Sequence, residues 1–395
     1  MLSNRLKRWT LRFGAAAVAL AGTAGLAMAQ EPIKIGLLLP YSGPFADLAV
    51  QMDGGVQVYM KQFGDTIGGR KVEILKRDTT GIAPDTAKRL AQELIVRDKV
   101  DLLAGVVFTP NALAIAPLTV EAKKPFVIMN AATSIVTTKS PYIVRVSFTL
   151  PQVVSPLGTW AAKNGFKKVY SLVSDYGPGH DSEIFFKKSF TAAGGEIVGE
   201  VRVPPKNPEF TPYIQRIKDA KPDAVFVFLP AGEQTVSFYK GVTERGLVKD
   251  GIKILASGDL TEDGQIEATG DIALGTITSG HYSYAHKSPE NEAFVKAFEA
   301  AFPKGPRPNF FAVGAYDGMG AIYGAIKAQN GQTDPDKMVE FMKNYKVMSP
   351  RGPLEIDPET RDAVNTIYIR KVEKHGGKLL NIEFDSVAKV KDPGK

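Results

Sequence analysis

Residues 101–134 read DLLAGVVFTPNALAIAPLTVEAKKPFVIMNAATS, and two similar units follow one another in this stretch. Residues 101–107 form a nearly unbroken apolar run, which is typical of a parallel strand covered on both faces. A helix rich in small residues is expected after Pro110, and residues 126–129 then repeat the apolar run. The stretch therefore predicts neighbouring strands of a parallel α/β sheet.

A hydroxyl side chain follows each of these two predicted strands. Thr109 comes after the first run and Thr133 after the second. Ligands of open α/β sheets bind outside the carboxyl ends of the strands, and the unpaired amides at a helix start attract anions. We expect Thr109 and Thr133 to face one pocket that suits a carboxylate. The alternative is that both threonines only cap turns.

Strand and helix patterns alternate along most of the chain. One set of units precedes residue 150, and a second set of about four units lies between residues 151 and 256. A last β-pair is expected around residues 354–356 and 367–372. A chain of 395 residues exceeds what one hydrophobic core usually supports, so the pattern predicts two doubly wound α/β lobes.

The first 29 residues have the features of a signal peptide. The basic segment MLSNRLKRWTLR precedes the weakly apolar FGAAAVALAGTAGLA, and Ala27-Met28-Ala29 fits the small-x-small cleavage rule. A retained membrane anchor is the alternative, but no later apolar run approaches twenty residues. Export to the periplasm is therefore expected. The absence of cysteine excludes disulfides and thiol nucleophiles, and it is compatible with that compartment.

The charge of the chain gives no case for nucleic-acid binding. The formal net charge is +7, and the first 29 residues carry four basic and no acidic side chains. Subtracting these four charges leaves +3 for the remainder. Such a small charge does not predict an electrostatic footprint for nucleic acid.

Catalytic, cofactor and metal motifs are missing from the sequence. It has no phosphate-binding loop, nucleophile elbow, metalloprotease helix or dinucleotide fingerprint. His281 and His286 form a weak candidate metal pair, but their spacing is not helical, and we interpret them as surface or hinge histidines. Asp175, His180 and Asp181 lie in one predicted loop without a nucleophile, where Asp181 is expected to cap a helix. We expect no enzyme activity, cofactor or metal.

Five short motifs together resemble one known family. They are Ser42-Gly43-Pro44, residues 105–109, Ala131-Ala132-Thr133, Asp175-Tyr176-Gly177 and Ala315-Tyr316-Asp317. In this order and spacing the chain resembles the leucine/isoleucine/valine-binding proteins, the periplasmic solute-binding subunits of branched-chain-amino-acid-type ABC importers.

The resemblance implies the type I periplasmic-binding-protein fold, in which two α/β lobes are joined by three crossovers and close around a ligand. The crossovers are expected near Leu150, Gly280 and Gly352. Lobe 1 would then comprise residues 30–149 plus 281–351, and lobe 2 would comprise residues 150–280 plus 352–395.

The resemblance also implies which residues bind the ligand. The family's hydroxyl contacts to a ligand carboxylate fall on Thr109 and Thr133, its backbone contact on Ala131, and its covering aromatic side chain on Tyr176. The acidic residue that holds the ammonium group of an amino acid matches Asp259 only after a one-residue shift.

The first-helix loop departs from the family pattern. It has Phe45, and it has Leu48 where a tyrosine would fit. Phe108 would add a further aromatic wall, although core packing is its alternative role. Turn capping is the alternative role for Asp259.

The leading hypothesis is a monomeric periplasmic receptor that delivers a small carboxylate to a membrane permease. A hydroxybenzoate-like or hydroxycinnamate-like aromatic acid would donate its hydroxyl to Asp259, whereas a branched-chain amino acid would place its ammonium group there. The aromatic acid is slightly favoured. A sensor ectodomain of the same fold is a less favoured hypothesis, and an enzyme is the least favoured.

Overall fold

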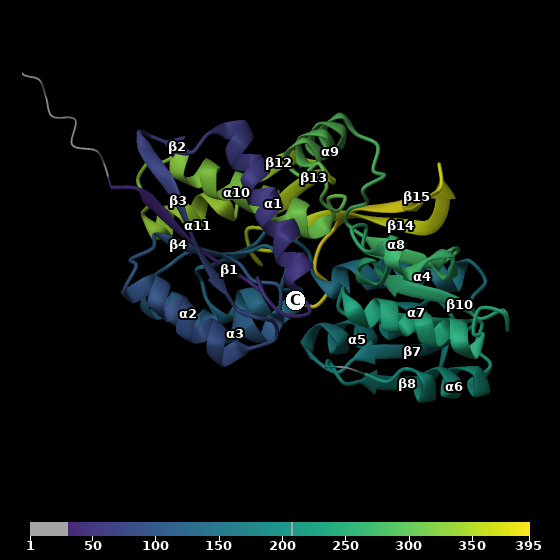
Figure 1. Ribbon diagram of the computed structural model, residues 1–395. Helices are drawn as coiled ribbons and strands as arrows, with labels where there is room; N and C mark the ends of the chain where they lie inside the picture. The colour runs from purple at the N-terminus through teal and green to yellow at the C-terminus, as the bar shows by residue number, and fades with distance from the viewer. Residues whose placement is uncertain (1–30, 207) are drawn as a thin grey trace, which may run out of the picture. The chain divides into compact units, whose positions relative to one another are not determined.

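The computed structural model describes residues 31–206 and 208–395, so the predicted signal peptide lies outside the described residues. The described chain contains two sheets with helices on both faces. Figure 1 shows the elements of the first sheet in purple to blue, and most of those of the second in teal and green. The predicted pair of doubly wound α/β lobes is confirmed.

The first sheet is mainly parallel. Its strands lie in the order β2 (Thr66–Ile67), β3 (Arg70–Asp78), β1 (Ile33–Leu39), β4 (Leu102–Gly105), β5 (Phe126–Ile128) and β6 (Ile143–Arg145). All residues of β1 except Lys34 are buried, because both faces of the sheet are covered.

Helices pack on both faces of the first sheet. Figure 1 shows α2 and α3 on one face and α1, α10 and α11 on the other. The helices of this lobe are α1 (Ala46–Phe63), α2 (Pro84–Val96), α3 (Thr109–Glu121), η1 (Ser134–Lys139), α9 (Pro289–Ala301), α10 (Phe310–Lys327) and α11 (Pro335–Met342). The side-chain oxygen of Asn309 caps α10 by accepting hydrogen bonds from the N–H groups of Phe311 and Ala312.

The second sheet combines parallel and antiparallel strands. Its parallel part has the order β11 (Ile277–Gly280), β10 (Lys253–Ser257), β9 (Ala224–Phe228), β7 (Lys168–Ser174) and β8 (Glu196–Val203). Four antiparallel strands extend it beyond β11, namely β14 (Ala363–His375), β15 (Lys378–Val390), β13 (Gly352–Ile356) and β12 (Lys346–Ser349).

The helices of the second lobe connect its parallel strands. They are α4 (Leu150–Lys163), α5 (Gly177–Ala192), α6 (Thr211–Ala220), α7 (Glu233–Arg245), η2 (Gly258–Thr261), α8 (Ile266–Thr269) and η3 (Asp271–Ala273). Thr149 begins α4 with a capping box, because its side chain and that of Gln152 each accept a hydrogen bond from the other's backbone N–H.

The predicted final β-pair is confirmed, since β13 and β14 pair antiparallel. The sequence analysis missed β15, which joins β14 through a turn at Gly376 and Gly377, both with positive φ. One prediction about these elements is wrong. Helix α5 begins at Gly177, four residues earlier than Asp181. Asp181 therefore lies inside α5 and does not cap it.

Three segments join the two lobes. The first runs from β6 into α4, the second from β11 into α9, and the third enters β14. An isolated bridge between Arg145 and Asp362 holds the residue before β14 beside the first sheet. The exact lobe boundaries given above stay a prediction.

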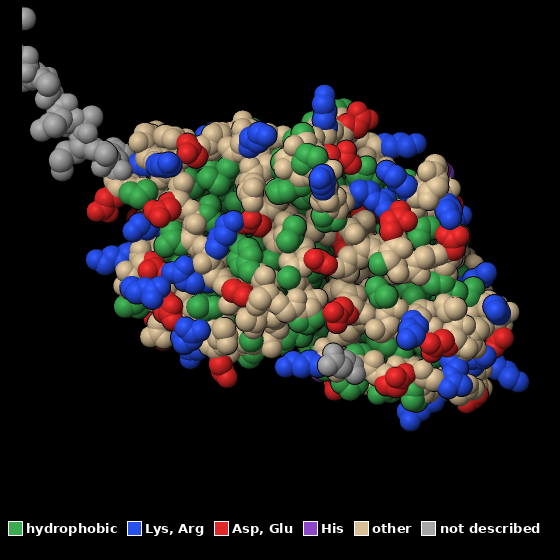
Figure 2. Space-filling view, in the orientation of Figure 1, with side chains coloured by type: hydrophobic (Ala, Val, Ile, Leu, Met, Phe, Trp, Pro, Cys, Tyr) green, Lys and Arg blue, Asp and Glu red, His purple; other side chains and the backbone are tan. Residues whose placement is uncertain are grey.

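The described surface has mixed charge. Figure 2 shows Lys and Arg side chains interspersed with Asp and Glu over the visible face. Within residues 31–206 and 208–395, no helix has both the length and the apolar character needed to cross a membrane.

Candidate functional site

The two threonines that follow β4 and β5 lie in direct contact. The Oγ1 atoms of Thr109 and Thr133 are 2.9 Å apart, and the backbone N–H of Thr133 donates to Thr109 Oγ1 at 3.4 Å. Strands β4 and β5 are neighbours in the sheet, so their carboxyl ends bring the two side chains together. The structure thus forms a pair of hydroxyls, here called the threonine pair.

The backbone before Thr109 has an uncommon conformation. Gly105 and Val106 have φ of 103° and 62°, and the N–H of Val106 donates to Leu38 O at 2.9 Å. A Cβ on Gly105 would lie 2.8 Å from Leu38 O, so the close approach requires glycine. A positive φ at a β-branched residue is rare and strained, and such residues cluster at functional sites.

A buried arginine fixes the turn that carries Thr133. The Nη1 atom of Arg145 donates to the carbonyl oxygens of Ala131 at 2.7 Å and Thr133 at 2.8 Å, while Nε donates to Asp362 Oδ1 at 2.7 Å. The N–H of Ala131 donates to Val106 O at 3.1 Å. Both backbone polar groups of Ala131 therefore have partners within the chain, and its contact to a ligand stays a prediction.

The start of α5 faces the threonine pair from the second lobe. A Cβ on Gly177 would lie 2.9 Å from Thr133 Oγ1 and 3.6 Å from Thr109 Cγ2. Helix α3 begins at Thr109 itself, so two helix N-termini meet at the threonine pair. Helix N-termini carry partial positive charge and exposed N–H groups, so this arrangement favours an anion.

Two carboxylates bind the residue that follows the threonine pair. The N–H of Ser134 donates to Asp181 Oδ2 at 2.9 Å, and its hydroxyl donates to Asp392 Oδ1 at 2.9 Å. Burial raises the pKa of Asp181. Asp181 thus bonds across the two lobes, a role that its sequence position did not indicate.

Aromatic rings of the predicted site pack in pairs on each lobe. Phe45 packs edge-on against Phe108, with ring centroids 4.7 Å apart, and Tyr176 stacks on Phe228 at 6.0 Å. Phe108 is also part of the buried core, as its alternative role anticipated. Leu48 is buried in the same core and borders a different hollow, which Glu262 and Asn309 also line.

Asp259 follows β10 and is buried. Its Oδ2 atom accepts a hydrogen bond from Ser257 Oγ at 2.8 Å, and burial raises its pKa to about 6. Burial also raises the pKa of Tyr176, and the nearby charge of Asp259 raises it further. Asp259 and Tyr176 therefore lie close together in the second lobe.

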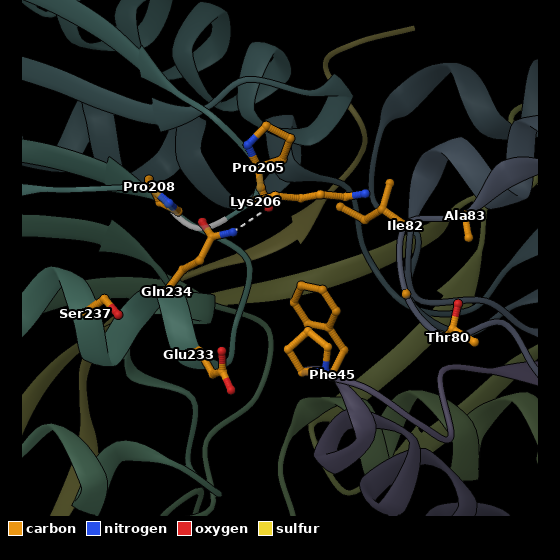
Figure 3. A pocket seen from close by; sticks show the side chains of 12 residues that line it. Phe45, Thr80, Ile82, Ala83, Pro205, Lys206, Pro208, Glu233, Gln234 and Ser237 are labelled. Atoms are coloured by element: carbon orange, nitrogen blue, oxygen red, sulfur yellow. Dashed lines mark hydrogen bonds between the residues drawn. The ribbon is translucent and has the colours of Figure 1, made fainter.

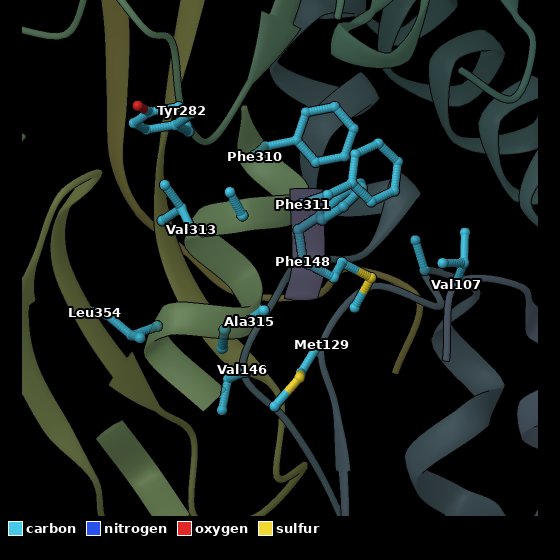
Figure 4. Packing of buried hydrophobic residues seen from close by; sticks show 14 of the residues in the cluster. Val107, Met129, Val146, Phe148, Tyr282, Phe310, Phe311, Val313, Ala315 and Leu354 are labelled. Atoms are coloured by element: carbon cyan, nitrogen blue, oxygen red, sulfur yellow. The ribbon is translucent and has the colours of Figure 1, made fainter. Parts of the chain in front are cut away.

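A small cavity of about 10 Å³ lies beside Asp259, where the segments between the lobes pass. A volume of this size holds about one water-sized group. Figure 4 shows Phe148, Phe310 and Tyr282, which border it, within the packed aromatic core. Its polar lining comes from Asp259, Ser279, His281 and Arg370.

Sequence reasoning missed Ser279 and Arg370, and it interpreted His281 only as a surface or hinge histidine. Ser279 and Arg370 lie in β11 and β14 without a recognisable motif, so no local signal marked them.

A larger pocket of about 340 Å³ lies between the two lobes. Figure 3 shows Phe45, Thr80 and Ile82 on one side and Lys206, Glu233 and Gln234 on the other. The side chain of Gln234 donates to Pro205 O at 2.6 Å. Of the predicted site residues only Phe45 lines this pocket, so the threonine pair and Asp259 lie outside it.

The histidines do not form a metal centre in the described part of the chain. His281 stacks on Phe148 with centroids 4.5 Å apart, whereas His286 Nδ1 lies 2.8 Å from Glu383 Oε2. Among the described residues, no group of three potential ligands comes together.

Comparisons with known proteins agree with this architecture. The family model described as periplasmic binding protein matches residues 32–378. The Leu/Ile/Val-binding protein homolog 6 of Brucella melitensis is 44% identical over 379 residues, which cover 96% of this chain and 97% of that protein.

Two solved structures are also similar. A solute-binding protein of an ABC transporter from Rhodopseudomonas palustris BisB5, in complex with 3,4-dihydroxybenzoic acid, is 52% identical with a TM-score of 0.89. A second from R. palustris, in complex with 4-hydroxybenzoate, is 44% identical with a TM-score of 0.90. Each alignment covers 92% of this chain and 99% of the other chain. The chain belongs to the periplasmic binding proteins, in the family of the Leu/Ile/Val-binding solute receptors of ABC transporters.

Proposed function

We propose that this chain is an exported receptor that binds a hydroxybenzoate-like aromatic acid between its lobes and delivers it to an ABC permease. It acts as a binding protein without catalysis, and residues 1–29 direct it to the periplasm. The observation that carries the proposal is the threonine pair with two helix N-termini directed at it.

The carboxylate is the part of the ligand that this arrangement recognises. The Thr109 and Thr133 hydroxyls bond to each other at 2.9 Å, and each is able to turn and donate to an anion. Hydrogen bonds to a charged acceptor are stronger than neutral ones, and the start of α5 adds favourable electrostatics. Closure of α5 onto the threonine pair would then bury the carboxylate.

The aromatic ring of the ligand fits the apolar lining. Phe45 and Phe108 offer an edge-to-face pair, and Tyr176 stacks on Phe228 from the second lobe. Related structures from R. palustris hold 3,4-dihydroxybenzoic acid and 4-hydroxybenzoate, which supports an aromatic ligand here.

A branched-chain amino acid is the second candidate. The Brucella relative is named as a Leu/Ile/Val-binding homolog, and Asp259 offers a carboxylate for an ammonium group. Burial raises the pKa of Asp259 to about 6, so the carboxyl is still mostly ionised at neutral pH and is able to pair with an ammonium group.

Calorimetric titration of the mature protein with 4-hydroxybenzoate and with leucine tests the choice. We expect binding of the aromatic acid and none of leucine. Thr109→Val keeps the shape but removes the hydroxyl, and it should weaken 4-hydroxybenzoate binding by about 10- to 150-fold, as for a lost charge-assisted hydrogen bond.

Thr109→Ser is the matched control, because it retains the hydroxyl and should bind nearly as well as the wild type. Binding of leucine without binding of 4-hydroxybenzoate would contradict the proposal and favour a branched-chain amino acid as the ligand. An unchanged affinity in Thr109→Val would contradict the carboxylate assignment.

A further inference from the structure

Two side-chain atoms in the small cavity beside Asp259 have no hydrogen-bond partner in the described structure. They are Ser279 Oγ and His281 Nε2, and their residues are 0% and 3% exposed. A buried polar atom without a partner costs free energy, so such atoms are rare in native proteins. Both residues line the cavity, where a ligand group would be able to satisfy them.

Arg370 adds a buried cation to the same wall. Its guanidinium donates to Thr278 Oγ1 from Nε at 3.2 Å and from Nη2 at 3.1 Å, and to the carbonyl of Tyr282 from Nη1. Burial lowers the pKa of Arg370, and the charges of Asp263, Glu383 and Asp259 partly offset this by favouring its protonated form. The cation is therefore compensated without a direct bond to any of these carboxylates.

The mixture of charges decides which ligand group fits the cavity. An ammonium group would lie close to Arg370, and a carboxylate would lie close to Asp259. Both placements bring like charges together in a buried site, which is costly. A phenolic hydroxyl is uncharged, donates one hydrogen bond and accepts others, so it suits Asp259 as acceptor and Arg370 as donor.

The cavity has aromatic walls and room for a single hydroxyl group. Its volume is about 10 Å³, which is about the space of one water. Phe148 and Phe310 line it, with ring centroids 5.7 Å apart, and His281 stacks on Phe148. A ring whose hydroxyl enters the cavity would pack against these side chains.

The cavity and the threonine pair are neighbours in the cleft. The N–H of Leu150 donates to Ala132 O at 2.9 Å, which places Leu150 beside the turn that carries Thr133. Phe148, which lines the cavity, precedes Leu150 by two residues. Tyr176 precedes Gly177 at the threonine pair and is also close enough to Asp259 for its pKa to be raised.

The two polar groups of a ligand would meet different walls. The threonine pair follows strands of the first sheet, whereas Ser279 and Arg370 belong to β11 and β14 of the second sheet. A ring hydroxyl that reaches this wall must point away from the carboxylate, in the para or meta position.

We propose that Ser279, His281 and Arg370, with Asp259, form a hydroxyl-recognising subsite that selects para- and meta-hydroxylated aromatic acids over unsubstituted and ortho-hydroxylated ones. This inference rests on the proposed function, because it assumes that an aromatic carboxylate occupies the cleft. It adds the specificity of the site and three residues that determine it.

Calorimetric titration with 4-hydroxybenzoate, benzoate and 2-hydroxybenzoate tests the subsite in the mature protein. The wild type should bind 4-hydroxybenzoate at least about tenfold more tightly than the other two acids, because they leave buried polar groups unpaired. Ser279→Ala should weaken 4-hydroxybenzoate binding by about fivefold and leave benzoate binding unchanged.

A matched control comes from a second buried strand serine whose hydroxyl has no partner. Ser171 lies in β7, is 2% exposed and also has an unpartnered hydroxyl, but it does not line the cavity. Ser171→Ala should change neither affinity. His281→Phe is a second test variant, since it retains a ring beside Phe148 and removes the nitrogen; it should also weaken binding of the hydroxylated acid selectively.

The outcomes separate the two proposals. Equal wild-type affinities for benzoate and 4-hydroxybenzoate, or equal losses for both acids in Ser279→Ala and His281→Phe, would overturn the subsite and leave aromatic-acid binding intact. Absence of binding for all three acids would overturn the proposed function and the subsite with it. Circular dichroism of each variant shows whether a general loss of binding reflects misfolding.

Discussion

Gly177→Ala is the perturbation that probes closure of the cleft most directly. The added Cβ would lie 2.9 Å from Thr133 Oγ1, well inside the 3.5–4.0 Å separation at which nonbonded heavy atoms pack best. The Thr133 hydroxyl cannot move away freely, because it bonds to Thr109 Oγ1 at 2.9 Å. The start of α5 must therefore withdraw from the threonine pair by several tenths of an ångström.

The cost of this overlap sets the expected loss of affinity. Overpacking a close contact typically costs about 1–3 kcal/mol, which corresponds to about a 5- to 150-fold weaker affinity if the contact forms only in the closed state. The ligand-free protein is able to avoid the overlap by opening. Gly177 does not have a positive φ, so alanine suits the helix start and should raise the ligand-free stability by up to about 1 kcal/mol.

Calorimetric titration with 4-hydroxybenzoate and denaturant unfolding of the ligand-free protein measure the two effects. Ile184→Ala is the control, because Ile184 lies on the same helix but is 51% exposed. We expect weaker binding and equal or higher stability for Gly177→Ala, with no change in affinity for the control. Wild-type affinity in Gly177→Ala would refute the reasoning that α5 closes directly on the threonine pair.

Two further predictions concern buried charges. Arg145→Met should lower the free energy of unfolding by about 3–5 kcal/mol, because among the described residues it leaves the buried Asp362 with Lys395 as its one remaining ion-pair partner. A loss below about 1 kcal/mol in urea unfolding would contradict this role of Arg145. For Asp259, burial raises the folded-state pKa from 3.8 to about 6, so the folded state binds the proton more tightly than the unfolded state. This contribution is fully present below pH 4 and is lost as the pH rises through 6, which lowers the stability of the ligand-free protein by up to about 3 kcal/mol. The free energy of unfolding, measured at several pH values, should decline less with rising pH in Asp259→Asn than in the wild type. Parallel stability curves for the two proteins would argue against a raised pKa of the buried Asp259 carboxyl.

The sequence predicted the repeated strand and helix units well because their signals are local. Continuous apolar runs such as β9 mark strands buried on both faces, and prolines and glycines mark the turns. The threonine pair was predictable from the sequence as well, because adjacent parallel strands place their carboxyl ends at one edge of the sheet. The start of α5 was misplaced because GPGHD has weak helix propensity, and packing of α5 on α4 overrides it.

The sequence alone determined the fold class, the two sets of parallel strands and the threonines at their ends, because each depends on patterns within about ten residues. Tertiary structure decided which distant groups share a site. Arg370 reaches Thr278 across 92 positions of the chain only because β14 pairs antiparallel with β11. Gly177 meets Thr133 only because the second lobe packs against the first. Such pairings depend on burial and geometry between remote segments, which no local pattern records.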